Sequence, residues 1–131
     1  MFKSIRTSKD NKTVVSELTK SLNLGPENII ARLAFAHSIS SNKKLDLQDI
    51  KDSRGKEYSR NVLLGEFSDI YIALICQHYN LYKTDKDIPR YIKMHIDDGL
   101  ETLYTEFNEQ RNVRGIEFLL NKIEIGIQQL A

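Results

Sequence analysis

The residues best suited to chemistry are lysines that share one side of the first predicted helix. At about 100° per residue, Lys9, Lys12 and Lys20 fall within about 80° of one another, whereas Asp10 and Glu17 fall to one flank. A strip of this kind can lie along DNA phosphates, where each contact releases counterions and makes binding salt-dependent. With the two basic residues just upstream, the predicted DNA-binding set, here called the basic strip, is Lys3, Arg6, Lys9, Lys12 and Lys20. The alternative interpretation is an ordinary solvated lysine face, which many exposed helices carry.

The charge distribution favours an anionic partner for the first half of the chain. The 131 residues carry a net charge of only +1. Residues 1 to 60 hold 12 Lys and Arg against 7 Asp and Glu, whereas residues 61 to 131 hold 7 against 11. Lys43 and Lys44 are secondary members of the predicted DNA-binding set. If the basic strip does not bind DNA, the surface is expected around Lys43, Lys44, Arg54 and Lys56. No aromatic residue stands among the lysines of the strip, which favours duplex backbone contact over stacking on single strands.

The other titratable residues form no catalytic or metal-binding pattern. His95, Asp97 and Asp98 in HIDDGLE come closest to a metal or nuclease cluster, but helical spacing is expected to point the three in different directions. The single Cys76 leaves no internal disulfide and no paired-thiol zinc site. Walker, dinucleotide-binding, metalloprotease, nucleophile-elbow and kinase motifs are absent from the sequence. We therefore assign no catalytic, cofactor-binding or metal-ligating residue, and expect neither a bound metal nor an essential thiol.

Arg32 is the only Lys, Arg, Asp or Glu after Glu27 in the run GPENIIARLAFAHSIS. No acid stands three or four residues from it, so its partner has to come from another element. The structural interpretation is a guanidinium bound by a carboxylate or by carbonyls at a helix end, because an unpaired buried guanidinium is prohibitively unfavourable. The functional alternative is a phosphate ligand, although Glu27 in the first turn would repel an anion.

Helical spacing of apolar residues dominates the sequence and predicts a mainly α fold. We expect a compact bundle of about five helices, with a short N-terminal extended segment at residues 2 to 7 and an irregular connector or small hairpin at residues 41 to 60. The predicted helices span residues 8–22, 26–40, 61–80, 87–110 and 112–130. A chain of this length is expected to form a single DNA-binding helical domain, residues 1–131.

Two of the predicted helices, at residues 29 to 39 and 116 to 130, are apolar on opposite sides. Such helices are buried on more than one face, which favours a homo-oligomer in a chain of this size. No apolar run reaches the roughly 18 residues of a membrane span. The first residues also lack the apolar core of a secretory signal, so a cytoplasmic protein is expected.

The segment IRTSKDNKTVVSELTKSLNLGPENIIARLAFAHSIS resembles the opening of the DNA sulfur modification protein DndE family. The similarity lies in the IRTSK start, the lysine-bearing helix, the LNLGPENIIAR turn and helix start, and the closing SIS. The chain length and the later segments YIALICQHYN and GIEFLLNKIE are similar too. The resemblance therefore covers most of the chain and is weakest in the connector.

The resemblance implies a small helical accessory protein of the bacterial DNA phosphorothioation system, in which sulfur replaces a non-bridging phosphate oxygen. It implies a non-catalytic homotetramer that binds DNA, preferably nicked duplex, through a lysine-rich surface. The cysteine desulfurase, sulfur-transferring and ATPase parts would belong to partner proteins. Two alternatives stay open: a strand-helix-helix transcriptional regulator, and a DNA-nicking enzyme whose site is assembled across subunits around HIDDGLE.

Overall fold

Helices make up most of the computed structural model, which describes residues 2–110 and 115–130. The α-helices within these ranges are α1 Lys9–Leu22, α2 Glu27–Ser40, α3 Arg60–Leu64, α4 Ser68–Tyr79, α5 Ile88–Glu109 and α6 Gly115–Leu130. Two 3-10 turns, Leu47–Asp49 and Gly65–Phe67, and two strands, β1 Ser4–Arg6 and β2 Glu57–Ser59, complete the described elements. Among the described helices, none has both the length and the apolar character to cross a membrane. The predicted mainly helical fold class is confirmed.

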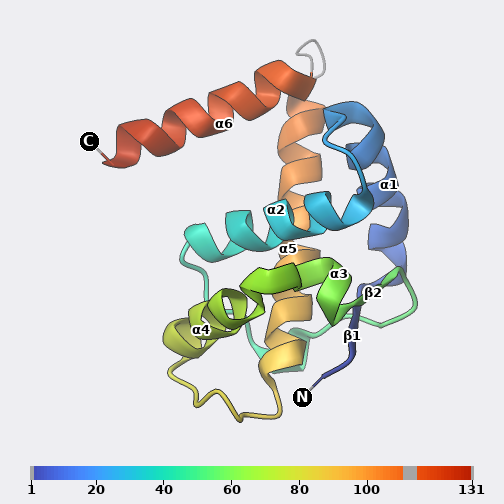
Figure 1. The fold of residues 1–131 in the computed structure, drawn as a ribbon. Coiled ribbons are helices and arrows are strands. Elements are labelled where there is room, and N and C mark those ends of the chain that lie inside the picture. Colours follow the sequence, from blue (N-terminus) through green and yellow to red (C-terminus); the bar gives the residue numbers. More distant parts are fainter. Residues whose placement is uncertain (1, 111–114, 131) are drawn as a thin grey trace.

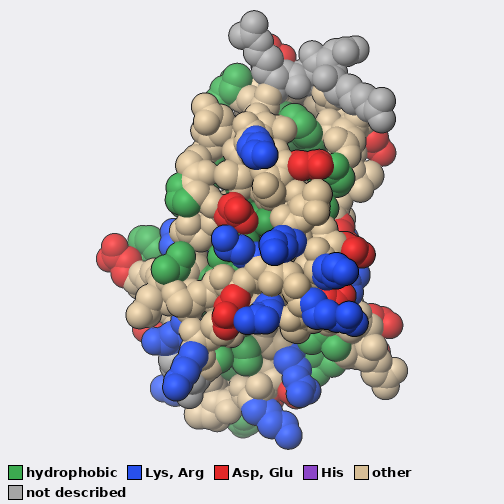
Figure 2. Space-filling view, turned by 90° about the vertical axis from the view of Figure 1, so that its right-hand side faces the viewer, with side chains coloured by type: hydrophobic (Ala, Val, Ile, Leu, Met, Phe, Trp, Pro, Cys, Tyr) green, Lys and Arg blue, Asp and Glu red, His purple; other side chains and the backbone are tan. Residues whose placement is uncertain are grey.

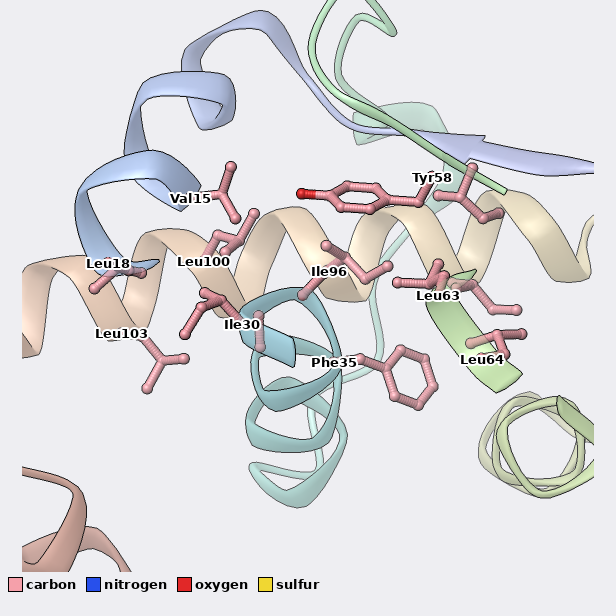
Figure 3. Packing of buried hydrophobic residues seen from close by; sticks show 14 of the residues in the cluster. Val15, Leu18, Ile30, Phe35, Tyr58, Leu63, Leu64, Ile96, Leu100 and Leu103 are labelled. Atoms are coloured by element: carbon pink, nitrogen blue, oxygen red, sulfur yellow. The ribbon is translucent and has the colours of Figure 1, made fainter. Parts of the chain in front are cut away.

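The long helix α5 forms the centre of the molecule, and the other helices are arranged around it (Figure 1). The main chains of α2 and α5 approach closely where the two helices cross: a Cβ at Gly99 would lie 1.8 Å from the carbonyl oxygen of Ala34. Glycine is therefore required at this crossing. Buried side chains from several helices fill the space on either side (Figure 3), among them Val15, Leu18, Ile30, Phe35, Leu63, Ile96, Leu100 and Leu103.

The two short strands pair in antiparallel fashion and join the N-terminal segment to the connector. Ile5 lies opposite Tyr58, and both are buried, while Arg6 lies opposite Glu57. The connector was expected to be irregular or to form a small hairpin of its own. Its strand pairs instead with the start of the chain, more than 50 residues away.

The predicted continuous helix at residues 61 to 80 is wrong. Helix α3 ends at Leu64, a 3-10 turn follows, and α4 begins at Ser68. Gly65 has a φ of +57°, in the left-handed region that ends helices and favours glycine. The other helices lie within one residue of their predicted ends wherever these are described, whereas the predicted start of the last helix at residue 112 lies outside the described residues.

Candidate nucleic-acid interface

Two carboxylates from distant parts of the chain hold the start of α1. Ser8 occupies the N-cap position, but its side chain makes no capping bond. Its backbone N–H donates to Asp97 Oδ1 at 3.1 Å, and the N–H of Lys9 donates to Asp52 Oδ1 at 3.0 Å. The amide of Lys9, followed by that of Arg54, lowers the pKa of Asp52 below its usual value. Since protein carboxylates already take these amides, the N-terminus of α1 is not an open phosphate site.

Asp97 is also the acid of a buried ion pair. Its Oδ2 accepts from Lys93 Nζ at 2.7 Å, and its Oδ1 accepts from Asn11 Nδ2 at 2.7 Å. All three residues are buried. Their pairing fastens α1 to α5 and so fixes which side of α1 faces the solvent.

The lysines of α1 lie on that solvent side. Lys9, Lys12 and Lys20 are exposed, whereas Val15 and Leu18 are fully buried on the opposite side of the helix. Within the described residues, no ion pair joins any of these three lysines to an acid. The exposure that the helical spacing predicts is therefore present, and the DNA-binding role of the lysines stays a prediction.

The two upstream residues of the basic strip differ in their surroundings. Lys3 is exposed. Arg6 is also exposed, but its Nη2 lies 2.9 Å from Glu57 Oε2 on the neighbouring strand. Glu57 accepts a second bond from Ser4 Oγ at 2.8 Å, and these contacts, the one from Ser4 first, lower the pKa of Glu57. Part of the charge of Arg6 is therefore balanced within the protein.

The connector adds two basic residues to the same region. The N–H of Gly55 donates to the carbonyl of Thr7 at 2.9 Å, and the N–H of Thr7 donates to the carbonyl of Lys56 at 3.0 Å. Arg54 and Lys56 are thereby held beside the junction of β1 and α1. Figure 2 shows Lys and Arg side chains gathered over the lower half of the face that carries these elements, with several Asp and Glu side chains between them. The only feature of the sequence that indicates this position of Arg54 and Lys56 is the glycine between them, Gly55.

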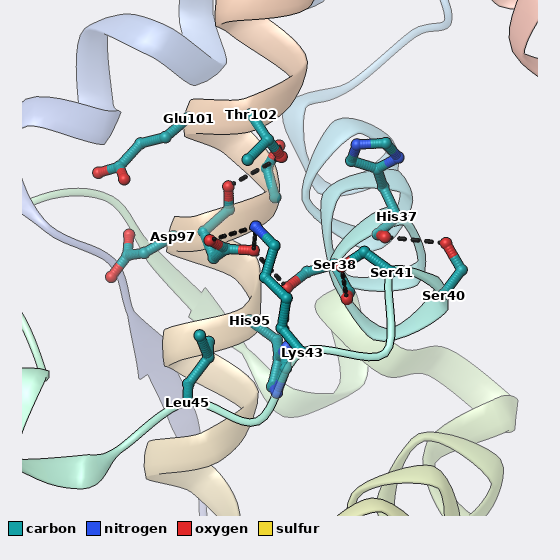
Figure 4. Close-up of polar contacts among 12 residues, drawn as sticks. His37, Ser38, Ser40, Ser41, Lys43, Leu45, His95, Asp97, Glu101 and Thr102 are labelled. Carbon is teal, nitrogen blue, oxygen red and sulfur yellow. Dashed lines mark hydrogen bonds and ion pairs between the residues drawn. The ribbon is translucent and has the colours of Figure 1, made fainter.

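The structure places Lys43 and Lys44 against α5 and its acids. Lys43 Nζ lies 3.1 Å from both carboxylate oxygens of Asp98 (Figure 4). Lys44 lines a cavity of about 250 Å³ whose walls include Asp49 and Glu101. The group of four alternative basic residues is thus divided, with Arg54 and Lys56 beside α1 and the other two beside α5. A DNA role for Lys43 and Lys44 stays a prediction.

A buried chain of hydrogen bonds surrounds His95. The hydroxyl of Ser38 donates to Asp98 Oδ2 at 2.7 Å and lies 2.8 Å from His95 Nδ1. Tyr79 Oη lies 2.6 Å from His95 Nε2 and accepts from the N–H of Leu45 at 2.9 Å. Because the Ser38 proton is directed to Asp98, Nδ1 donates to Ser38 and Nε2 accepts from Tyr79. Burial lowers the pKa of His95 to about 4, so the ring is neutral at physiological pH.

HIDDGLE forms no metal site in the structure. Asp97 points toward α1 and so away from the other two, which agrees with the expected separate directions. His95 and Asp98 share Ser38, so that expectation is wrong for this pair. Among the described residues, no group of three His, Cys, Asp or Glu is arranged to hold a metal ion. The polar atoms of this segment are satisfied by other protein groups, which is the arrangement of a structural network.

Arg32 has a structural partner. Its Nη2 donates to the carbonyl of Val62 at 2.8 Å, and its Nε donates to the carbonyl of Leu63. Both carbonyls belong to the last turn of α3, where they lack partners within the helix. The structural interpretation, a guanidinium satisfied by carbonyls at a helix end, is confirmed.

Comparison with known proteins agrees with this fold. The family model of the DNA sulphur modification protein DndE matches residues 4–111. The crystal structure of DndE from Escherichia coli B7A, involved in DNA phosphorothioation modification, is 20% identical, covers 79% of this chain and 98% of its own, and has a TM-score of 0.64. The crystal structure of a DndE G21/24K mutant involved in DNA phosphorothioation is 23% identical with the same coverage and a TM-score of 0.65. No curated protein matches the chain.

Proposed function

Because the chain belongs to the DndE family of DNA sulphur modification proteins, and so to the DNA phosphorothioation system, we propose that it is a non-catalytic DNA-binding subunit of that system. DNA and the other proteins of the system are then its partners. The proposed contact surface is the basic strip, extended at the junction of β1 and α1 by Arg54 and Lys56.

The observation that carries this proposal is the state of the lysines on α1. Lys9, Lys12 and Lys20 are exposed on one helix, and their charges are not balanced by an ion pair within the described residues. Such cations neutralise DNA phosphates directly and release counterions. Arg6 and Lys43 first have to leave Glu57 and Asp98, so the lysines of α1 are the better phosphate ligands. Lys56 likewise has an acid nearby, since its Nζ lies 3.9 Å from Glu27 Oε1.

The preferred substrate in this proposal is nicked duplex, and the preferred assembly is a homotetramer, both as the family resemblance implies. A nick interrupts one strand and makes the duplex easier to bend. Bending costs less at such a site, and the bent DNA can reach more basic residues of a multi-subunit particle. The predicted preference thus has a physical cause that an affinity measurement can detect.

The test compares two triple variants. Changing Lys9, Lys12 and Lys20 to Ala removes the charges, whereas changing the same residues to Arg retains them. Binding of both variants and the wild type is measured on intact, nicked and single-stranded DNA of one sequence over a range of salt concentrations. We expect the Ala variant to lower the slope of log K against log salt by about 2 to 3 for each strip in contact, and the Arg variant to keep it.

The same variants show whether folding is the cause of any loss. Exposed lysines contribute little to stability, typically within about 0.5 kcal/mol each, so both triple variants should unfold at nearly the wild-type temperature. An unchanged salt slope in the Ala variant would place the DNA surface elsewhere. Double Ala variants at Arg54 and Lys56 and at Lys43 and Lys44 would then identify it.

The two alternative functions gain no support from the described residues. A strand-helix-helix regulator needs its strand for DNA, but β1 is paired with β2 of the same chain. A nicking enzyme would need the acids of HIDDGLE, and Asp97 is bound to Lys93 and Asn11. The DNA-binding subunit is therefore the function that the site supports best.

A further inference from the structure

Helix α6 presents a regular row of apolar side chains to the solvent. The row lies on one side of the helix with successive spacings of 4, 3, 4 and 3 residues, the spacing of the a and d positions of a coiled coil. Positions d are Ile116, Ile123 and Leu130, and positions a are Leu120 and Ile127. We call these five residues the α6 seam; their exposed fractions are 58%, 58%, 90%, 55% and 62% in that order.

The contacts of α6 with the rest of the chain lie outside the seam, although Leu119, at the edge of the seam, also packs against the core. Phe118 is fully buried, with its ring edge-on to Phe107 at a centroid distance of 5.3 Å. Lys122 pairs with Glu106 of α5. Phe118 and Lys122 lie roughly 120–160° around the helix from the centre of the seam. Figure 1 shows α6 extending away from α5, with its C-terminal end apart from the other elements.

Helix α2 does not share this feature. Both α2 and the last helix were predicted to be apolar on opposite sides. The apolar sides of α2 are covered by other elements of the same chain. Ile30 and Phe35 are buried, and the Phe35 ring meets the Tyr71 ring of α4 at 5.3 Å. The family match also ends at residue 111, before α6 begins. One open apolar surface thus lies on the helix beyond the matched segment; a smaller exposed apolar group, with Val62, Phe67 and Ile70, lies around α3 and α4.

We propose that α6 is a self-association arm, in which the α6 seams of several copies of this chain pack against one another in parallel. This inference rests on the homo-oligomer part of the proposed function and adds to that oligomer a contact on one helix outside the matched segment. An isolated helix of this length is only marginally stable in water, so a half-exposed α6 gains from a partner helix. Burying the seam would remove on the order of 500 Å² from each copy, and two copies together reach the roughly 1,000 Å² that a specific interface has to bury as a minimum.

The composition of the seam indicates how the copies meet. Leu120 at a, next to Ile116 and Ile123 at d, is the combination that favours bundles of more than two helices. At the C-terminal end of the seam, Ile127 at a and Leu130 at d form the combination that favours two helices. Glu117 and Glu124 occupy e positions. An antiparallel pair would set these acids against the same acids of the other copy, whereas a parallel pair sets them against g positions, here Leu119 and Gly126. A second copy in parallel orientation therefore fits the seam without like-charge repulsion.

The first test is the mass of the full-length protein in solution, measured by light scattering without DNA. Ile123→Glu places a charge in the middle of the seam. Ile125→Glu is the matched control, because it makes the same change two residues away, at a side chain of similar exposure (50%) on the opposite side of α6. We expect the wild type and Ile125→Glu to be oligomers at micromolar concentration. The concentration below which Ile123→Glu dissociates should be at least about tenfold higher than that of the wild type.

Each outcome decides one part of the proposal. A monomeric wild type would overturn both the oligomer and the α6 assignment. An oligomeric wild type whose mass is unchanged by Ile123→Glu would overturn the α6 assignment alone. Because no DNA is present, neither result depends on the DNA-binding proposal. Circular dichroism of both variants establishes that the fold is intact.

The second test addresses orientation in a Cys76→Ser background. Position 123 is in the middle of the seam, so a cysteine there lies next to the same cysteine of a second copy in both orientations. A cysteine at position 127 lies next to its equivalent only in a parallel pair. We expect oxidation to cross-link both Ile123→Cys and Ile127→Cys into covalent dimers. Cross-linking of Ile123→Cys alone would overturn the parallel arrangement.

Discussion

At the residue scale, His95 shows how one buried polar side chain connects four segments of the fold. Its ring lies between Ser38 of α2 and Tyr79 of α4, and these in turn bind Asp98 of α5 and the backbone of Leu45 in the connector. Every polar atom of the ring has a partner, and the neutral form is the one that fits. Protonation would place a charge in this buried chain.

The pH dependence of stability should therefore contain a contribution from His95. Its folded pKa of about 4 lies below its usual value of 6.5, so the unfolded chain binds a proton in this window that the folded chain does not. The contribution of neutral His95 to the free energy of unfolding is fully present above pH 6.5 and is lost as the pH falls toward 4. We expect the wild type to lose about 2 kcal/mol more than His95→Gln between these pH values in urea unfolding.

The variant isolates His95 because His37, whose pKa burial also lowers, is present in both proteins. His95→Gln should be less stable than the wild type at pH 7, where the neutral ring makes both of its hydrogen bonds. Parallel curves of unfolding free energy against pH for the two proteins would contradict the assignment.

At the scale of elements, the crossing of α2 and α5 depends on one glycine. Gly99 allows the main chain of α5 to approach that of Ala34 so closely that any side chain at this position would overlap with backbone. The His95 network and the anchoring of α1 by Asp97 lie on the same segment of α5. The spacing of these two helices therefore also sets the positions of the polar groups that orient α1.

Gly99→Ala should destabilise the protein by about 3 kcal/mol, because its Cβ would meet backbone that cannot move aside without separating the helices. Gly126→Ala is the matched control: it lies in α6, and its Cβ would meet nothing within 4 Å. This second change should stabilise α6 by roughly 0.5–1 kcal/mol. Urea unfolding at one protein concentration measures both; equal effects of the two changes would contradict the close crossing.

The elements differ in how far the sequence predicts them. Periodicity located α1, α2 and α5 and the exposed lysine side of α1, because these are local properties of the chain. The pairing of β1 with β2 joins three-residue strands, which are too short to show an alternation. The carboxylates that hold the start of α1, Asp52 and Asp97, lie 43 and 89 residues away from the amides they accept. Such contacts depend on the folded arrangement, and so does the ion pair that balances Arg6.

At the scale of the whole molecule, the two proposed surfaces lie on different elements. The basic strip runs from Lys3 along β1 and α1, and the exposed α6 seam lies at the other end of the sequence. Self-association through α6 would therefore join several basic strips in one particle. A particle with several strips can hold one duplex at more than one place, and linked contacts raise affinity well above that of a single contact.

The length of the DNA should then separate single from multiple contacts. On a duplex long enough for several strips, the wild type and Ile125→Glu should bind at least about tenfold more tightly than Ile123→Glu, since linked sites can gain roughly 10² or more in affinity. On a duplex that spans one strip, all three proteins should bind alike, because the substitution leaves the lysines of α1 in place. Electrophoretic mobility or fluorescence anisotropy with the two lengths at one salt concentration provides the measurement. If Ile123→Glu proves monomeric and yet binds the long duplex as tightly as the wild type, the strips act independently, and assembly through α6 serves another purpose than DNA affinity.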